Sequence, residues 1–334
     1  MIQQILTIAH NAFVEATRQP IYVVLLLAAT VLLVVNPSLS AYTMDDDNKI
    51  LVDMGLSTLF LAGLLLSAFT ATGVLSAEVE NRTVLTVVSK PVSRPTFVTG
   101  KYLGVAAALA VAFWTLTLIF LLTVRHEVIQ RATDPFDMPV IVFGVLAGLT
   151  ALLGATLANY FYQWVFTSTF VFAFAGLTTV SLVMVLMINK EWQFQSIATD
   201  VDPQLLTALL LVFEAVLILT AVAVACSTRL GQVMTLVTCV LVFLLGLVTH
   251  YFSMQADKTL GDLEGSPFHH GLYWMLKLFF LVVPNLQYLW HADALTQGHP
   301  ITGQHVILLS VYSVCYIAAI LSLAIALFQT REVG

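Results

Sequence analysis

The charged and proline residues between positions 77 and 101 form the most distinctive stretch of this 334-residue chain. The segment reads AEVENRTVLTVVSKPVSRPTFVTGK and follows directly after an apolar run. Asn81 can cap a short helix over about 82–89, and Pro91 ends that helix because proline has no amide proton to donate. Ser93 can then cap the next helix. The pattern predicts a short, rigid amphipathic helix between two longer helices, bordered by charges of both signs.

Two ionisable residues lie inside long apolar runs. Glu214 is near the middle of the run Leu205–Ala225, and Lys277 interrupts the run Gly271–Trp290. If these runs lie in a bilayer, a carboxyl group at the centre costs about 2.5–3.5 kcal/mol on insertion scales and is a functional hypothesis by default. We therefore expect Glu214 to act in translocation or gating, with Lys277 as its candidate partner. The alternative is a hydrogen-bonded glutamate that holds two helices together.

Six of the eight histidines lie between positions 250 and 305, with several carboxylates nearby. Histidine and carboxylate together can bind zinc or copper. No two of these histidines have the i, i+4 spacing that places both side chains on one face of a helix. We therefore predict no metal site. The three cysteines lie in apolar runs and have neither a disulfide pattern nor CxxC spacing.

The composition shows what kind of elements must position these residues. Hydrophobic residues make up 59% of the chain and charged residues 10%, whereas soluble domains have about 45–50% and about 25%. This excludes a soluble enzyme, a disordered chain and a coiled coil, and it indicates a polytopic membrane protein. The net charge of −6 argues against a nucleic-acid partner, which needs a basic face.

Eight apolar runs are predicted to cross the bilayer, for which a helix needs about 20 residues; the first run is shorter and must borrow residues from its flanks. They are Ile21–Val35, Gly55–Ser76, Tyr102–Val124, Val140–Tyr160, Trp164–Ile188, Leu205–Ala225, Val233–Tyr251 and Val306–Phe328. A ninth run, Gly271–Trp290, contains Lys277 and the break Pro284-Asn285. We predict that it is a re-entrant helix within an outer segment over 252–302, because protein can shield a break and a charge that lipid cannot. A ninth span is the alternative.

Residues 1–19 place apolar side chains at helical spacing opposite polar ones, which predicts an N-terminal helix lying in the membrane interface. An extension of the first span is the alternative. Lysine and arginine gather at one side of the predicted bundle, in the loop 77–101 and at Arg18, Arg229 and Arg331. The positive-inside rule then puts both termini in the cytoplasm. The predicted fold class is an all-α polytopic membrane protein, with residues 1–334 forming a single transmembrane domain.

The loop pattern Glu-x-Glu-x-x-Thr, then Lys-Pro-Val-Ser-Arg, then Gly-Lys resembles the first cytoplasmic loop of ABC transporter permeases of the ABC-2 type. The closest resemblance is to the group described with multi-copper enzyme maturation. The matching residues are Glu78, Glu80, Thr83, Lys90, Pro91, Val92, Ser93, Arg94, Gly100 and Lys101. Arg18-Gln-Pro20 and Cys226-Ser-Thr-Arg229 resemble two further parts of that family.

The resemblance implies that the loop 77–101 is a coupling helix that docks on a separate ATPase subunit. The residues assigned to docking are Glu78, Glu80, Arg82, Thr83, Lys90, Pro91, Arg94, Lys101 and Arg229. Simple positive-inside anchoring is the alternative for the basic ones. The chain contains no phosphate-binding motif GxxxxGK[ST], so ATP and magnesium are expected in the partner and not in this chain.

The resemblance also implies a function. The chain would be the permease subunit of an ATP-driven exporter in a bacterial cytoplasmic membrane, paired with a second permease copy as a homodimer or with a related permease. The family's usual permease has about six spans, so the hairpin Val140–Ile188 is a departure. A stand-alone secondary transporter or channel remains the alternative, and it would need several charges along a path through the membrane. A membrane enzyme is a third class, for which the chain offers no dense catalytic motif.

Overall fold

The computed structural model describes the whole chain except residues 1, 42–46, 81–92, 130–135, 262–266 and 330–334. The described part is helical, and eight of its helices are long and apolar enough to cross a membrane. These are α2 (Pro20–Ser40), α3 (Asp47–Glu80), α5 (Arg94–His126), α6 (Met138–Tyr162), α7 (Phe166–Met187), α8 (Pro203–Ser227), α9 (Gln232–Gly261) and α12 (Gly303–Gln329). The predicted all-helical fold with eight spans is therefore confirmed.

Capping residues set where several of these helices begin. Ser93 precedes α5, and its hydroxyl accepts a hydrogen bond from the Thr96 backbone N–H, as the sequence predicted. Asp137 caps α6 and Asp202 caps α8 in the same way, each accepting a backbone N–H of the first turn. A proline in the first turn follows each cap, where its missing N–H costs no hydrogen bond.

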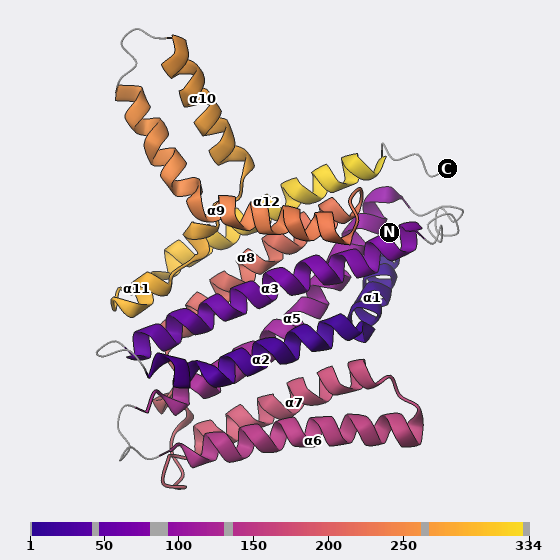
Figure 1. The fold of residues 1–334 in the computed structure, drawn as a ribbon, viewed down its shortest axis with the longest axis vertical. Coiled ribbons are helices and arrows are strands. Elements are labelled where there is room, and N and C mark those ends of the chain that lie inside the picture. The colour runs from indigo at the N-terminus through magenta and orange to yellow at the C-terminus, as the bar shows by residue number, and fades with distance from the viewer. Residues whose placement is uncertain (1, 42–46, 81–92, 130–135, 262–266, 330–334) are drawn as a thin grey trace.

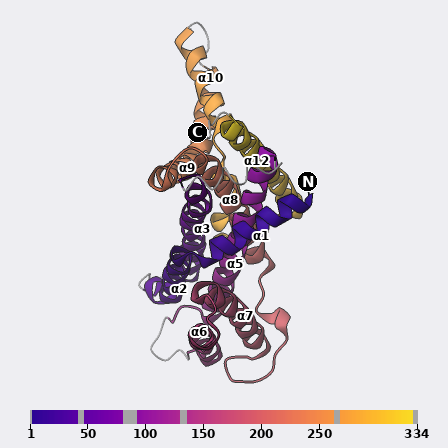
Figure 2. The same ribbon diagram turned by 90° about the vertical axis from the view of Figure 1, so that its right-hand side faces the viewer.

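The helices form a bundle with α5 and α8 in its middle (Figures 1 and 2). Helix α8 is the most buried of the spans and packs against α3 and α12. Helices α6 and α7 pack on one another as a hairpin at one side of the bundle, joined to it mainly through α7 and α5. Gln163, with a left-handed φ of 57°, makes the turn between them. The hairpin predicted as an addition to the family pattern is thus present as α6 and α7.

The ninth apolar run is broken. Helix α10 (Pro267–Val282) ends before Pro284-Asn285, and the 3-10 helix η2 (Leu286–Leu289) and the short helix α11 (Ala292–Thr296) follow. The two halves of this run are bent by 45°, as expected for a re-entrant or broken span. Helix α10 packs against α9, and α10 projects with the last part of α9 from the rest of the molecule in Figure 1, whereas the first part of α9 packs against α3 and α8.

Helix α1 (Ile2–Arg18) confirms the predicted N-terminal helix and lies across the first turns of α5. Two glycines of α5 allow this close approach. A Cβ added at Gly104 would lie 2.4 Å from the Ala9 carbonyl oxygen, and one added at Gly100 would lie 2.8 Å from the Ile8 Cβ. The start of α1 and the end of α12 lie at this end of the bundle in Figure 1. We call it the N-terminal end; it holds α1, the end of α3, the start of α5 and the end of α12.

Replacing Gly104 by alanine tests this packing. The new methyl group would clash with the backbone of α1, so α1 must shift. We expect a loss of about 1–3 kcal/mol in the free energy of unfolding, the usual cost of overpacking, seen as a lower melting temperature in mild detergent. Gly176→Ala is the matched control, because a Cβ there meets nothing within 4 Å. Equal melting temperatures for the two variants would contradict the packing described here.

Candidate functional site

Lys101 of α5 is buried at the N-terminal end and joins three helices. Its ammonium nitrogen lies 3.4 Å from a carboxylate oxygen of Glu15 on α1 and 3.4 Å from the carbonyl oxygen of Val74 on α3. The Lys101 side chain is 3% exposed, whereas that of Glu15 is 38% exposed. Breaking a buried ion pair by removing one partner leaves an uncompensated charge, which is strongly unfavourable. Lys101 therefore ties α1 and α3 to the first turns of α5.

The end of α12 is attached to the same region. Arg229, in the turn after α8, donates two hydrogen bonds of 2.6 and 3.0 Å to the carbonyl oxygen of Leu327. The last carbonyl groups of a helix have no partner within the helix, and an arginine can satisfy them. The rings of Phe97 on α5 and Phe328 on α12 also stack, with centroids 5.5 Å apart.

The structure places the residues assigned to ATPase docking in three ways. Arg82, Thr83, Lys90 and Pro91 lie outside the described residues. Glu78 and Glu80 form the end of α3 and Arg94 begins α5, so these positions flank that segment at the N-terminal end. Lys101 and Arg229 lie at the same end, but their described contacts are made inside the chain, to α1, α3 and α12.

Glu214 lies half-buried in α8 and is held by two serines of α12. The hydroxyls of Ser310 and Ser313 donate hydrogen bonds of 2.6 and 3.1 Å to its two carboxylate oxygens. Their i, i+3 spacing places both serines on the face of α12 that meets α8. Sequence reasoning missed this pair, although two serines three residues apart in an apolar run are the signal that could have identified it. A carboxyl group with two donors on a neighbouring span can hold the two helices together.

The sequence suggests Lys277 as the partner of Glu214, but the contact described for Lys277 is with an aromatic ring of its own helix. It lies on α10, and its ammonium group sits 5.9 Å from the centre of the Tyr273 ring on the same helix. Helix α10 packs against α9 and projects from the bundle (Figure 1). The described hydrogen bonds of Glu214 therefore come from α12.

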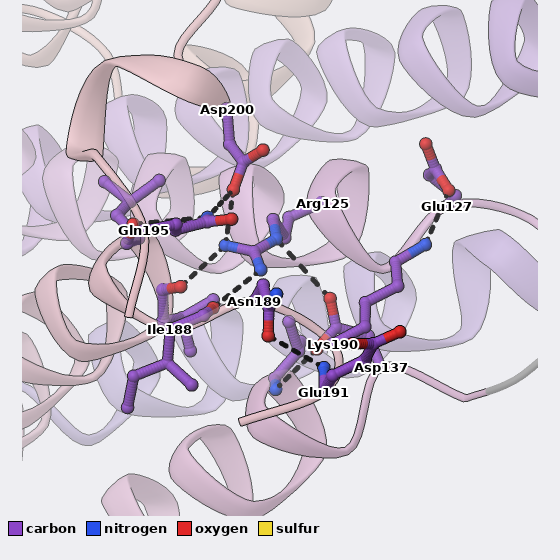
Figure 3. A network of polar contacts seen from close by, with 12 residues as sticks. Arg125, Glu127, Asp137, Ile188, Asn189, Lys190, Glu191, Gln195 and Asp200 are labelled. Atoms are coloured by element: carbon purple, nitrogen blue, oxygen red, sulfur yellow. Dashed lines mark hydrogen bonds and ion pairs between the residues drawn. The ribbon is translucent and has the colours of Figure 1, made fainter. Parts of the chain in front are cut away.

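A second buried cation, Arg125, lies near the other end of α5 (Figure 3). Its guanidinium group is 2.7 Å from a carboxylate oxygen of Asp200 and 3.4 Å from one of Asp137. It also donates hydrogen bonds of 2.6 and 2.8 Å to the carbonyl oxygens of Val185 and Ile188 at the end of α7. One side chain thus holds together the start of α6, the end of α7 and the segment that precedes α8.

The ion pair between Arg125 and Asp137 is buried, so removing one of the two charges is costly. The Arg125 side chain is 8% exposed and that of Asp137 is fully buried. A planar guanidinium has five donors and suits several acceptors at once. The nearby pair of Lys190 and Glu127, with atoms 2.8 Å apart, is solvent-exposed, and such pairs contribute little to stability. Arg125, Asp137 and Asp200 are far apart in the sequence, and nothing near them indicates that they meet, so this cluster was not predicted.

Within the described residues, no group of three or more histidine, cysteine, aspartate or glutamate side chains is arranged to hold a metal ion. The rings of His291 and His305 lie side by side, with centroids 5.3 Å apart.

Apolar spans, charges buried at the helix ends and one mid-span carboxyl group define a polytopic helical membrane protein. Residues 30–232, more than half of the chain, match the family model described as "ABC-2 family transporter protein". The chain belongs to this ABC-2 family. The matched region runs from α2 through α8 and includes both the segment 77–101 and the hairpin α6–α7. A comparison with curated proteins found no match.

Removing the charge of Arg125 tests its role at the end of α5. Arg125→Leu leaves the buried Asp137 carboxylate without its cation, which costs about 3–5 kcal/mol in comparable buried pairs. We expect a large drop in melting temperature in detergent and a lower yield of folded protein. Lys190→Leu removes a cation from the exposed neighbouring pair and should cost at most about 1 kcal/mol. Similar melting temperatures for the two variants would show that Arg125 does not hold this end together.

Proposed function

We propose that the chain is the membrane-spanning permease subunit of an ATP-driven ABC transporter that works as an exporter. A separate subunit binds ATP and magnesium and hydrolyses the nucleotide. The observation that carries this proposal is the family match over residues 30–232. Two copies of the chain, or this chain and a related permease, would enclose the path. The membrane is a bacterial cytoplasmic membrane, with the N-terminal end and both termini in the cytoplasm.

The length of two helices supports an ATPase dock at the N-terminal end. Helices α3 and α5 have 34 and 33 residues. At 1.5 Å per residue each is about 50 Å long, whereas the hydrocarbon core of a bilayer is about 30 Å thick. Both helices can therefore project from the membrane. The end of α3 and the start of α5 would then lie outside the hydrocarbon, where a soluble ATPase subunit can reach them.

Contacts inside the N-terminal end suggest how a push on these helix ends would be transmitted. Lys101 links α5 to Glu15 of α1 and to the Val74 carbonyl of α3, and Gly104 brings α1 into backbone contact with α5. Movement of the start of α5 would carry α1 and α3 with it. Helix α5 continues to Arg125, 24 residues and about 36 Å further along. The same movement would reach the start of α6 and the end of α7 through the Arg125 cluster.

Glu214 gives the proposed path a polar group near its middle. Its serine partners lie on α12, so relative movement of α8 and α12 would break or remake these hydrogen bonds. We assign Glu214 to gating on this basis.

A stand-alone secondary transporter or channel would also use such a carboxyl group, and it would need no ATPase. Co-purification of a stoichiometric ATPase subunit in mild detergent separates the two functions: its presence supports the ABC transporter, and an active chain without it supports the alternative.

Inverting the charges around the segment 81–93 tests the dock. Glu80→Arg together with Arg94→Glu changes residues outside the apolar core of the spans, so we expect the protein to insert and fold normally. The ATPase subunit should no longer co-purify, because each side chain would meet a like charge on its surface. Glu127→Arg with Lys190→Glu is the matched control, since it inverts an exposed pair at the opposite end. Wild-type recovery of the ATPase with the first variant would contradict docking at this segment.

Two substitutions separate the functional and structural roles of Glu214. Glu214→Gln keeps the shape and can still hydrogen-bond to both Ser310 and Ser313, accepting from one hydroxyl through its amide oxygen and donating to the other through its amide nitrogen, but it cannot carry a charge. We expect a normal yield of the complex and impaired ATP hydrolysis in reconstituted vesicles. Glu214→Leu removes the hydrogen bonds as well, each contributing about 1 kcal/mol or less in membrane helices, and should also lower the yield. Wild-type hydrolysis by Glu214→Gln would leave Glu214 as a purely structural residue.

A further inference from the structure

Two tyrosines of α12 hold the break between α10 and η2. The hydroxyl of Tyr316 donates a hydrogen bond to the carbonyl oxygen of Val282, the last residue of α10. The hydroxyl of Tyr312 accepts a hydrogen bond of 2.8 Å from the backbone N–H of Asn285. The two rings lie next to one another, with centroids 5.6 Å apart. One backbone group on each side of Pro284 is therefore bonded to α12.

These backbone groups need a partner because α10 ends here. The last carbonyl groups of a helix have no donor within the helix, and Pro284 has no N–H with which to continue the pattern. Asn285 caps η2 with its side-chain oxygen, which accepts from the N–H groups of Gln287 and Tyr288 at 3.1 and 3.3 Å. Its own backbone N–H is left for Tyr312. Asn285 is 2% exposed, and a buried N–H without a partner is unfavourable, so the bond to α12 stabilises the break.

Helix α9 closes the other side of the break. A Cβ added at Gly246 would lie 2.8 Å from the Pro284 carbonyl oxygen and 2.9 Å from the Leu286 Cγ. A larger residue at this position would push the break away from α9. Residues 283–296, which we call the η2–α11 segment, bury Leu286 and Leu289 and pack on α3, α8 and α9. The segment thus lies between these helices and the two tyrosines of α12.

The same stretch of α12 also holds Glu214. Ser310 and Ser313 donate to its carboxylate, so four hydrogen-bonding side chains lie within residues 310–316, about 9 Å of helix. The serines face α8, and the tyrosines lie on the neighbouring face, toward the break. Helix α12 is the least buried of the eight candidate spans. Because apolar packing constrains it least, these hydrogen bonds have a large share in fixing its position.

We infer that Tyr312 and Tyr316 are positioning residues that make the η2–α11 segment follow α12 when the bonds of Glu214 break. Two turns of helix are stiff, so a displacement of α12 that separates the serines from Glu214 must also displace the tyrosine hydroxyls. The tyrosines then carry the break with them, and the state of Glu214 sets the position of the η2–α11 segment. The use of this link in gating rests on the proposed function, whereas the link itself does not.

Hydrogen exchange of the full-length chain in nanodiscs, without an ATPase subunit, tests the inference. The backbone amides of residues 285–291 are followed by mass spectrometry. Glu214→Leu removes the serine bonds, and we expect these amides to exchange about two- to tenfold faster, the shift in a local opening equilibrium that one lost hydrogen bond gives. Glu214→Gln, which can still bond to both serines, is the matched control and should exchange like the wild type. Wild-type exchange in Glu214→Leu would overturn the inference.

Two phenylalanine substitutions show whether the tyrosines carry this effect. Tyr312→Phe with Tyr316→Phe keeps both rings but removes the hydroxyls, and should by itself speed the exchange of residues 285–291 about two- to tenfold. Adding Glu214→Leu to this double variant should produce no further change, because α12 no longer holds the break. Tyr22→Phe removes a hydroxyl that bonds α2 to a carbonyl of α5, and as the matched control it should leave these amides unchanged. Further acceleration by Glu214→Leu in the double variant would show that α8 acts on the segment directly, and would contradict a role for the tyrosines.

Two checks keep this result separate from folding and from the proposed function. Gel filtration shows whether each variant is folded, and Ser310→Ala with Ser313→Ala removes the same bonds from the α12 side if Glu214→Leu is not. The exchange measurement contains no ATPase, so a missing link between Glu214 and residues 285–291 overturns this inference alone. Failure of an ATPase subunit to co-purify would overturn the proposed function and leave the link standing.

Discussion

Helix α5 carries a buried cation at each end, and the arrangement of the other helices depends on how these two charges are neutralised. Burial removes an ammonium or guanidinium group from water, so each must find its acceptors within the protein. Lys101 finds them on α1 and α3, and Arg125 finds them at α6, α7 and the segment before α8. Between these two points α5 is apolar and largely buried, which makes it the central support of the bundle.

This arrangement accounts for how the helical hairpin of α6 and α7 is attached to the bundle. Helices α6 and α7 bury little of their own surface against the remaining helices, and the Arg125 cluster holds both of them at one end. Between that end and Gln163 an apolar groove lined by Gly144 and Gly148 separates α6 from α2. The N-terminal end is built differently, with glycines that bring α1 into direct contact with α5. The proposed ATPase dock and the Arg125 cluster thus lie at the two ends of α5.

Features encoded by local sequence could be predicted, and those created by packing could not. The eight spans, the Ser93 cap and the break at Pro284-Asn285 each follow from a short window of residues. By contrast, the sequence pattern assigns Lys101 to ATPase docking, and nothing near it in the sequence reveals that it is buried against Glu15. Glu214 stood out as a mid-span carboxyl group, but its partners Ser310 and Ser313 are almost 100 residues away. Hydropathy predicts which segments enter the membrane and says nothing about which of their polar atoms meet.

The central claim is that α1 and the start of α5 move as one unit when ATP drives the transporter. Pulsed electron paramagnetic resonance on the complex with its ATPase tests this claim. One pair of spin labels is placed within a chain, at the exposed positions His10 of α1 and Leu103 of α5. A second pair is placed at Leu103 of the two permease copies. The account predicts that the distance between His10 and Leu103 stays the same with and without ATP, while the distance between the two Leu103 positions changes. A change in the distance between His10 and Leu103 on ATP binding would contradict it.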